Sequence, residues 1–167
     1  FWATQSREPA RHYEHKELGY NYRMSNIVAG IGRGQLLSLK QHVALKKRIY
    51  QTYSKAFADM PEIQMNPYLP YTEPNFWLSC MTISPECKVT PVAVMDALAD
   101  QNIETRPIWK PMHMQPLFAK NDLIQVTDHK SVGEDIFNRG LCLPSDIKNT
   151  DQDMDLIIST VRKCFGR

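Results

Sequence analysis

The sequence predicts an α/β domain in which a long helix comes first and a small sheet packs against further helices. Residues 25–58 carry apolar side chains at roughly helical spacing, which predicts one long helix with an apolar face. Residues 76–83 are rich in aromatic and apolar side chains and are short enough for a buried strand. A helical pattern and a second candidate strand at 103–108 follow, so the chain shows the order strand, helix, strand.

The long helix is expected to begin after Ser25, whose hydroxyl can accept a backbone N–H that the first helical turn leaves unpaired. Gly30, Gly32 and Gly34 follow, and each lowers helix propensity by about 1 kcal/mol relative to alanine. Their spacing is not that of the dinucleotide-binding fingerprint, and no strand pattern precedes them. We therefore interpret these glycines as allowing another helix, or another subunit, to approach closely.

Loop and helix signals flank the first strand. Residues 1–18 are polar and show no period, so we expect a loop before the long helix. Residues 60–75 contain four prolines, which predict an extended loop between the long helix and the strand. Thr90 is a favourable N-cap and Pro91 a favourable first residue for a helix over 91–101.

The remainder of the chain predicts a helix, a short strand and a final helix. A capping box opens the helix expected at 131–139, and Gly140 fits the position after its end. Residues 141–143 can add a third strand, which the following proline stops. The final helix at 151–164 has acidic residues near its start and basic residues near its end, as the helix dipole favours.

Composition narrows the class of protein. The chain has 167 residues, 43% hydrophobic and 23% charged, which is typical of a globular domain with a core of its own. A net charge of +2, with both signs spread along the chain, argues against nucleic acid or an anionic membrane as partner. The four cysteines form no C-x-x-C pair and are not clustered with histidines, so neither a metal site nor a disulfide framework is predicted. We expect a reducing, cytoplasmic setting.

A polar loop before the long helix is the first candidate site. Tyr20, Asn21, Tyr22 and Arg23 place an amide, a guanidinium and two phenols next to the helix start at Ser25. Hydrogen-bond donors at the positive end of a helix dipole suit an anionic group such as a phosphate. The alternative is that both tyrosines pack on the helix start while the amide and the guanidinium only stabilise the turn.

A second candidate site follows the strand at 103–108. Arg106, Trp109, Lys110 and His113 bring two cations, an indole and an imidazole into one loop that its prolines stiffen. The guanidinium could pair with a carboxylate or phosphate, and the two rings could wall a site for a sugar or a base. The alternative is that the rings are half-buried packing residues and that Arg106 is tied to a neighbouring acidic residue.

These stretches together resemble a known family. The runs HYEHKELGYNYRMSNIVAGIGRGQL, PNFWLSCMTI, ETRPIWKPMHMQPLF and GLCLPS occur in this order. They resemble the C-terminal part of the DegT-type nucleotide-sugar aminotransferases, which are pyridoxal-phosphate enzymes of the aspartate-aminotransferase fold (fold type I). The resemblance implies the C-terminal small domain of that fold, with a mainly antiparallel three-stranded sheet. It also implies that residues 1–24 are a remnant of the large domain and its active-site loop, and that residues 25–167 form the small domain.

The resemblance implies roles for residues of both candidate sites. Asn21 would reach the phosphate of the cofactor held by the partner subunit of a homodimer, and Arg23 would face the nucleotide sugar at the same shared site. Arg7 would contact the nucleotide diphosphate, with Arg11 as the weaker candidate.

In the second candidate site, the resemblance implies that His113 contacts the substrate. Arg106 and Trp109 would then shape the mouth of the same site.

The resemblance further implies the reaction of an intact enzyme. An amino group, expected to come from glutamate, would pass to a nucleotide-linked keto sugar, expected to be a UDP-linked 4-keto-6-deoxy sugar used in glycan biosynthesis. None of the eleven lysines stands in the family's context for the Schiff-base lysine, which is expected to lie upstream. The chain is therefore expected to be a fragment that is inactive by itself. The alternative is a stand-alone two-layer α/β module that binds a ligand without catalysis.

Overall fold

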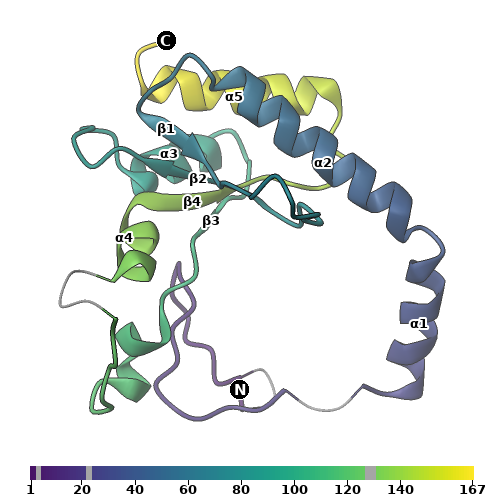
Figure 1. The fold of residues 1–167 in the computed structure, drawn as a ribbon, viewed down its shortest axis with the longest axis vertical. Coiled ribbons are helices and arrows are strands. Elements are labelled where there is room, and N and C mark those ends of the chain that lie inside the picture. Colours follow the sequence, from purple (N-terminus) through teal and green to yellow (C-terminus); the bar gives the residue numbers. More distant parts are fainter. Residues whose placement is uncertain (3–4, 22–23, 127–130) are drawn as a thin grey trace.

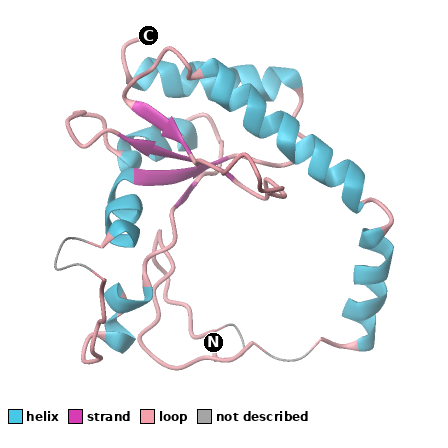
Figure 2. Cartoon of the chain, viewed as in Figure 1, coloured by secondary structure: helices cyan, strands magenta, loops and turns pink. Residues whose placement is uncertain are grey.

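The computed structural model describes residues 1–2, 5–21, 24–126 and 131–167 of the chain. This part consists of helices and a small sheet, joined by loops (Figure 2). The helices are α1 (Asn26–Leu36), α2 (Leu39–Ala56), α3 (Pro91–Ala99), α4 (Val132–Arg139) and α5 (Asp151–Cys164), with 3-10 turns η1 (Met112–Met114) and η2 (Pro116–Phe118). The strands are β1 (Ile63–Met65), β2 (Ser79–Ile83), β3 (Arg106–Pro107) and β4 (Gly140–Leu143).

The sheet is antiparallel throughout the described residues, in the order β1-β2-β4-β3. The predicted antiparallel pairing is confirmed, but the prediction of three strands is wrong, because β1 adds a fourth strand to the described part. β1 lies within residues 60–75, which the sequence predicted as an extended loop. Its three residues fall between Pro61 and Pro67, so each keeps the backbone N–H that a strand needs.

The hydrophobic core lies between one face of the sheet and helices α2, α3 and α5 (Figure 1). Met81 and Leu141 point from the central strands into this core, where each is 0% exposed, and Leu98 of α3 is likewise fully buried. Helix α4 lies on the other face, where Ile136 and Arg139 line a pocket together with strand residues such as Cys80. The fold predicted from the sequence, a small sheet packed against helices, is confirmed.

The predicted single helix over 25–58 is wrong in one respect, because the structure divides it into α1 and α2. At the break, Leu37 donates its N–H to Gly34 at 3.2 Å and Ser38 donates to Gln35 at 3.1 Å, so the backbone tightens into three-residue turns. None of the described residues of α1 is buried, whereas α2 buries Ile49 against the core. Packing against the core therefore stabilises α2. The glycines weaken α1, and no packing contact in the described part holds the two helices together as one continuous helix.

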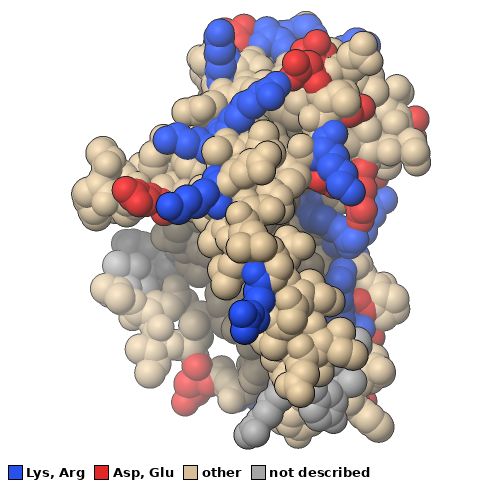
Figure 3. All heavy atoms as spheres, turned by 90° about the vertical axis from the view of Figure 1, so that its right-hand side faces the viewer, with Lys and Arg blue, Asp and Glu red and all other residues tan. Residues whose placement is uncertain are grey.

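Helix α1 stands away from the sheet and the other helices (Figure 1). Its apolar residues are open to solvent, with Ile27 77% and Ile31 60% exposed. On this side of the molecule, the surface around α1 is mostly uncharged, and lysines and arginines are more frequent further up, over α2 (Figure 3). A side chain added at Gly30, Gly32 or Gly34 would meet nothing within 4 Å. The approach of another helix or subunit to these glycines stays a prediction.

Several element boundaries differ from the prediction for identifiable reasons. β2 begins at Ser79, later than expected, because the chain turns at Phe76, whose φ is 52°. β3 is limited to two residues, because Pro107 has no N–H to extend the pairing. Helix α5 has the predicted bounds, and Thr150 and Asp153 form the capping box at its start.

The ion pair between Asp59 and Arg162 joins the turn after α2 to the last turn of α5, and it predicts a pH effect. Arg162 donates to both carboxylate oxygens of Asp59 at 2.8 Å and thereby lowers the pKa of that carboxyl to about 2. A pKa lowered by folding stabilises the protein above the ordinary carboxyl pKa, and this stabilisation is lost as pH falls toward 2. The variant Asp59→Asn should therefore be less stable than the unaltered protein at pH 6.

Urea denaturation at a series of pH values checks this prediction. The stability difference between the unaltered protein and Asp59→Asn should shrink as pH falls from about 4 to about 2. The matched control is Asp100→Asn, at an exposed aspartate after α3. A difference for Asp59→Asn that is constant across this window would contradict the assignment.

Candidate functional site

The N-terminal segment over residues 5–21 folds back on itself and carries the first candidate site. Arg7 and His15 form an antiparallel β-bridge, and His15 Nδ1 donates to the carbonyl of Gln5 at 2.6 Å. Gln5 and Ser6 both have positive φ, 67° and 52°, which turns the chain sharply at the start of the segment. The sequence of this segment has neither helical nor strand periodicity. These contacts nevertheless bring its start and its end together.

Arg7 and Asn21, both predicted from the sequence, line the same pocket. The pocket has a volume of about 680 Å³. Its other lining residues are Gln5, Glu8, Pro9, Ala10 and Tyr13. The Arg7 guanidinium lies 4.2 Å from the centre of the Tyr13 ring, which is a cation–π contact. Arg23, predicted at the same site, lies outside the described residues.

Gly19 is required where the segment closes on itself, and this predicts a local effect of substitution. A Cβ at Gly19 would lie 2.1 Å from the Gln5 carbonyl carbon and 2.4 Å from the Ser6 nitrogen, both backbone atoms that no side-chain rotation can move. Gly19→Ala should force residue 19 away from the backbone of Gln5 and Ser6 and displace Asn21. We expect amide hydrogen exchange in residues 5–21 to accelerate by roughly tenfold.

Exchange measured by mass spectrometry tests this effect against a matched control. Gly30→Ala changes a glycine in α1 that has nothing within 4 Å, so it should leave exchange in residues 5–21 unchanged. Exchange in β2 should be the same in both variants, because the core is untouched. Normal protection of residues 5–21 in Gly19→Ala would show that this close contact does not hold the segment.

The second candidate site is less compact in the structure than the sequence predicted. Trp109 is 41% exposed, and its indole lies 5.6 Å from that of Trp77, which is 62% exposed. Trp77 was missed, because the sequence placed it inside a buried strand; in the structure it precedes β2. The pair forms an open aromatic surface beside the loop that follows β3.

His113 lines a pocket of about 290 Å³ in the turns η1 and η2. Phe118, Asn121 and Asp122 are among the other residues that line it. The Nε2 atom of His113 is buried and has no hydrogen-bond partner among the described residues. A buried ring nitrogen without a hydrogen-bond partner costs free energy unless a ligand or water supplies the partner. His113 therefore remains a candidate for contact with the substrate.

Arg106 forms an ion pair with Glu104. This agrees with the alternative interpretation, in which Arg106 is tied to a neighbouring acidic residue. The side chain remains 50% exposed, and it lines a pocket of about 250 Å³ that also contains Arg11. Arg11 in turn donates to Asp96 of α3 at 2.8 Å. The structure thus places Arg106 and Arg11 together, separate from the pocket of Arg7, and a role for Arg106 at the substrate mouth stays a prediction.

Two further polar residues join the two candidate sites and were missed by sequence reasoning. Glu14 pairs with Lys110 of the second loop, and Gln115 binds the backbone of the N-terminal segment. Gln115 lies in the run PMHMQP, which could have marked it as a functional residue, but the sequence could not show which segment it contacts.

Other kinds of site were also sought in the described residues. No group of three or more histidine, cysteine, aspartate or glutamate side chains in these ranges is placed to hold a metal ion. Among the described helices, none combines the length and apolar character that a membrane crossing requires. Donors for an anion, by contrast, are present in the pocket of Arg7 and Asn21.

Solved structures of aminotransferases share the fold of this chain. An aminotransferase from Brucella abortus superposes with a TM-score of 0.73, at 19% identity over 99% of this chain and 42% of its own. Helicobacter pylori PseC, an aminotransferase involved in pseudoaminic acid biosynthesis, gives 0.72 at 19% identity over 99% of this chain and 44% of its own. In fold, the chain is the C-terminal part of a fold type I aminotransferase.

The chain belongs to the DegT/DnrJ/EryC1/StrS aminotransferase family, whose sequence model matches residues 3–162. It is 39% identical over 165 residues to EpsN of Bacillus subtilis strain 168, which is named as a pyridoxal phosphate-dependent aminotransferase. It is 30% identical over 158 residues to GDP-perosamine synthase of Caulobacter vibrioides. These matches cover 99% and 94% of the chain but 42% of each relative. The predictions of family and of pyridoxal phosphate as the family's cofactor are confirmed.

Proposed function

We propose that the protein containing this chain transfers an amino group to a keto sugar carried on a nucleotide, using pyridoxal phosphate. The observation that carries this proposal is the pocket that brings Arg7 and Asn21 together. The two residues supply a guanidinium and an amide, which are the donors that phosphate oxygens require. Membership of the aminotransferase family favours this activity over the alternative of a stand-alone binding module.

The residues of the pocket fit the phosphate of the cofactor. Asn21 is exposed at the rim, so its carboxamide N–H₂ is available to a group outside this chain. When bound, the cofactor supplies the electron sink that lets an amine move between carbon atoms. We propose that Asn21 holds the phosphate of a cofactor bound by a second copy of the protein. The protein would then be a homodimer, for which we propose a cytoplasmic setting, and each active site would draw residues from both subunits.

Arg7 is proposed to bind the diphosphate of the nucleotide sugar. Its cation–π contact with Tyr13 fixes the plane of the guanidinium, and a fixed planar guanidinium binds phosphate oxygens in pairs. Trp109 and His113 would contact the sugar from the second loop. A relative is named as a synthase of GDP-perosamine, a GDP-linked sugar, whereas the resemblance implied a UDP-linked substrate, so both nucleotides belong in the test.

The lysine that bears the cofactor is proposed to lie outside these 167 residues. Lys110, in the loop of the second candidate site, is 13% exposed and already paired with Glu14 at 2.7 Å. Lys46 donates to the carbonyl of Ser145. Borohydride reduction of the chain with pyridoxal phosphate should therefore label lysines weakly and at scattered positions. One stoichiometric adduct at a single lysine would contradict this proposal.

The decisive assay uses the complete enzyme with glutamate and UDP- or GDP-linked 4-keto-6-deoxy sugars. We expect an aminated nucleotide sugar, detected by mass spectrometry, together with one 2-oxoglutarate for each product formed. Omission of the keto sugar is the control. Cofactor-dependent exchange of amino groups between amino acids and keto acids, with no aminated sugar from either nucleotide, would overturn the proposed substrate class.

A further inference from the structure

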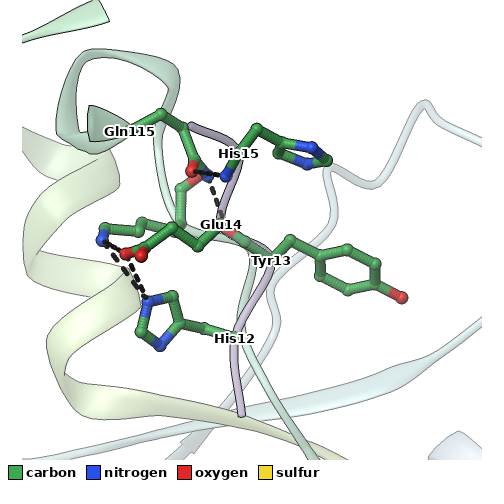
Figure 4. A network of polar contacts seen from close by, with 6 residues as sticks. His12, Tyr13, Glu14, His15 and Gln115 are labelled. Carbon is green, nitrogen blue, oxygen red and sulfur yellow. Dashed lines mark hydrogen bonds and ion pairs between the residues drawn. The ribbon is translucent and has the colours of Figure 1, made fainter. Parts of the chain in front are cut away.

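Two segments that are far apart in the sequence, residues 12–15 and 110–117, are joined by a set of polar side chains (Figure 4). We name this set the clasp, and it consists of His12, Glu14, Lys110 and Gln115. The first two belong to the segment that carries Arg7, and the other two to the loop of the second candidate site. The clasp therefore connects the two halves of the proposed site.

Gln115 is the anchor of the clasp. Its side chain is only 2% exposed, which is unusual for a glutamine in a loop. Its Oε1 accepts the backbone N–H of His15 at 2.8 Å, and its Nε2 donates to the carbonyl of Tyr13. Gln115 thus binds the backbone on both sides of Glu14, in the manner of a short strand pairing. A further bond, from the N–H of Leu117 to the carbonyl of His15 at 3.2 Å, continues this pairing.

An ion pair completes the clasp. Lys110 Nζ donates to Glu14 Oε2 at 2.7 Å, and the two side chains are 13% and 19% exposed. His12 Nε2 lies 3.3 Å from each of these two charged groups. The hydrogen bond from Lys110 lowers the pKa of Glu14, so the carboxylate stays ionised at neutral pH. Partly buried charged pairs of this kind are worth more than exposed ones.

Gln115 binds the backbone of two residues that contact Arg7. His15 is the β-bridge partner of Arg7, and the Tyr13 ring lies under the Arg7 guanidinium. Tyr13 and His15 are also the residues of the N-terminal segment whose backbone groups the Gln115 side chain binds. A shift of this backbone would therefore move the guanidinium directly.

We infer that Gln115, together with the ion pair of Lys110 and Glu14, is a positioning element that holds Arg7 for the diphosphate of the nucleotide. This inference rests on the proposed function and adds residues that act through Arg7 without touching substrate. The hydrophobic core, built on α2, α3, α5 and the sheet, contains no residue of the N-terminal segment. Loosening the clasp should therefore free the segment while leaving the core folded.

The test compares variants of the complete enzyme in their affinity for UDP and GDP, measured by calorimetry. In Gln115→Ala, the Kd of whichever nucleotide binds the unaltered enzyme should rise by about tenfold, with kcat within about twofold. Lys110→Met should weaken binding, and Lys110→Arg, which keeps the charge beside Glu14, should restore most of it. Lys120→Met, at an exposed lysine of the same loop, is the control and should bind normally.

A double variant separates positioning from general damage. If the clasp acts through Arg7, then Gln115→Ala added to Arg7→Ala should cause little further loss of affinity, because the group it positions is already gone. Hydrogen exchange in residues 5–21 should accelerate in Gln115→Ala, with β2 unchanged. If the two losses multiply instead, or if Gln115→Ala and Lys110→Met both bind the nucleotide normally, the inference is overturned.

The same data distinguish failure of the inference from failure of the proposed function. Normal amino transfer by the unaltered enzyme, with normal nucleotide affinity in Gln115→Ala and Lys110→Met, overturns the positioning role alone. An unaltered enzyme that binds neither UDP nor GDP and aminates neither sugar overturns both. If Gln115→Ala does not fold, the comparison of Lys110→Met with Lys110→Arg decides.

Discussion

Replacing Asn21 with alanine is expected to weaken the retention of pyridoxal phosphate by about tenfold or more in the complete enzyme. The loss of one amide hydrogen bond to a charged phosphate costs about 1.5–3 kcal/mol, and each 1.4 kcal/mol corresponds to about tenfold in affinity. The subunit should fold normally, because the Asn21 side chain is exposed and contributes to no part of the core.

Cofactor absorbance after dialysis at a series of pyridoxal phosphate concentrations measures this effect. Asn26→Ala is the matched control, since this asparagine is also exposed and lies at the first position of α1, five residues along the chain. We expect normal cofactor retention there. Equal retention in Asn21→Ala and the unaltered enzyme would remove Asn21 from the cofactor site.

Gly140→Ala is expected to destabilise the fold by roughly 3 kcal/mol, at the upper end of the usual cost of overpacking. A Cβ at Gly140 would lie 2.6 Å from Cγ1 of Ile108 and 2.7 Å from the backbone oxygen of Ile136. The first atom can rotate away, but the second is fixed by α4. Strand β4 would have to move away from α4, and the pairing with β2 and β3 would be disturbed with it.

Chemical denaturation of Gly140→Ala and of a control variant checks the prediction. Gly133→Ala, within α4, is the control, because the nearest atom to its added Cβ is at 3.5 Å, an ordinary contact. Alanine is favoured over glycine inside a helix, so Gly133→Ala should be neutral or slightly stabilising. Similar stabilities for the two variants would show that β4 can move away from α4 at little cost.

Local signals in the sequence were sufficient for much of the fold. The bounds of α5 follow from the cap at Thr150 and from the apolar spacing behind it, both of which are short-range features. Gly140 shows the limit of such reasoning. The sequence placed it directly after a helix, which is where it lies, but its φ of −113° is open to any residue, and the structure needs glycine there for space. Contacts with Ile108 and Ile136 decide this, and they are not visible in the local sequence.

The parts of the fold that sequence missed depend on long-range packing. The break after α1 could not be predicted from periodicity, because the apolar spacing continues through it. It follows from the absence of buried residues in the described part of α1. Likewise, β1 forms because β2 offers an edge to residues 63–65, which have weak strand character alone.

The structure brings some of the predicted site residues together and leaves others apart, and their roles stay predictions. Arg7 and Asn21 do line one pocket, and their roles toward the nucleotide diphosphate and the cofactor phosphate stay predictions. By residue type, Arg106 was an equally plausible ligand for a phosphate, but in the structure it forms an ion pair with its neighbour Glu104. The clasp was beyond sequence reasoning, because Gln115 and Tyr13 are separated by 102 residues.

A mixed-dimer experiment tests most directly whether the pocket of Arg7 and Asn21 is completed by a second subunit. Subunits with Asn21→Ala are combined with subunits whose cofactor-bearing lysine is replaced, and amino transfer is measured once mass spectrometry shows that dimers have mixed. Each variant alone should be weak or inactive. If the site is shared, the mixed dimer places both changes in one site and leaves the other intact, so activity should return in part. No return of activity in dimers shown to have mixed would mean that Asn21 acts within its own subunit.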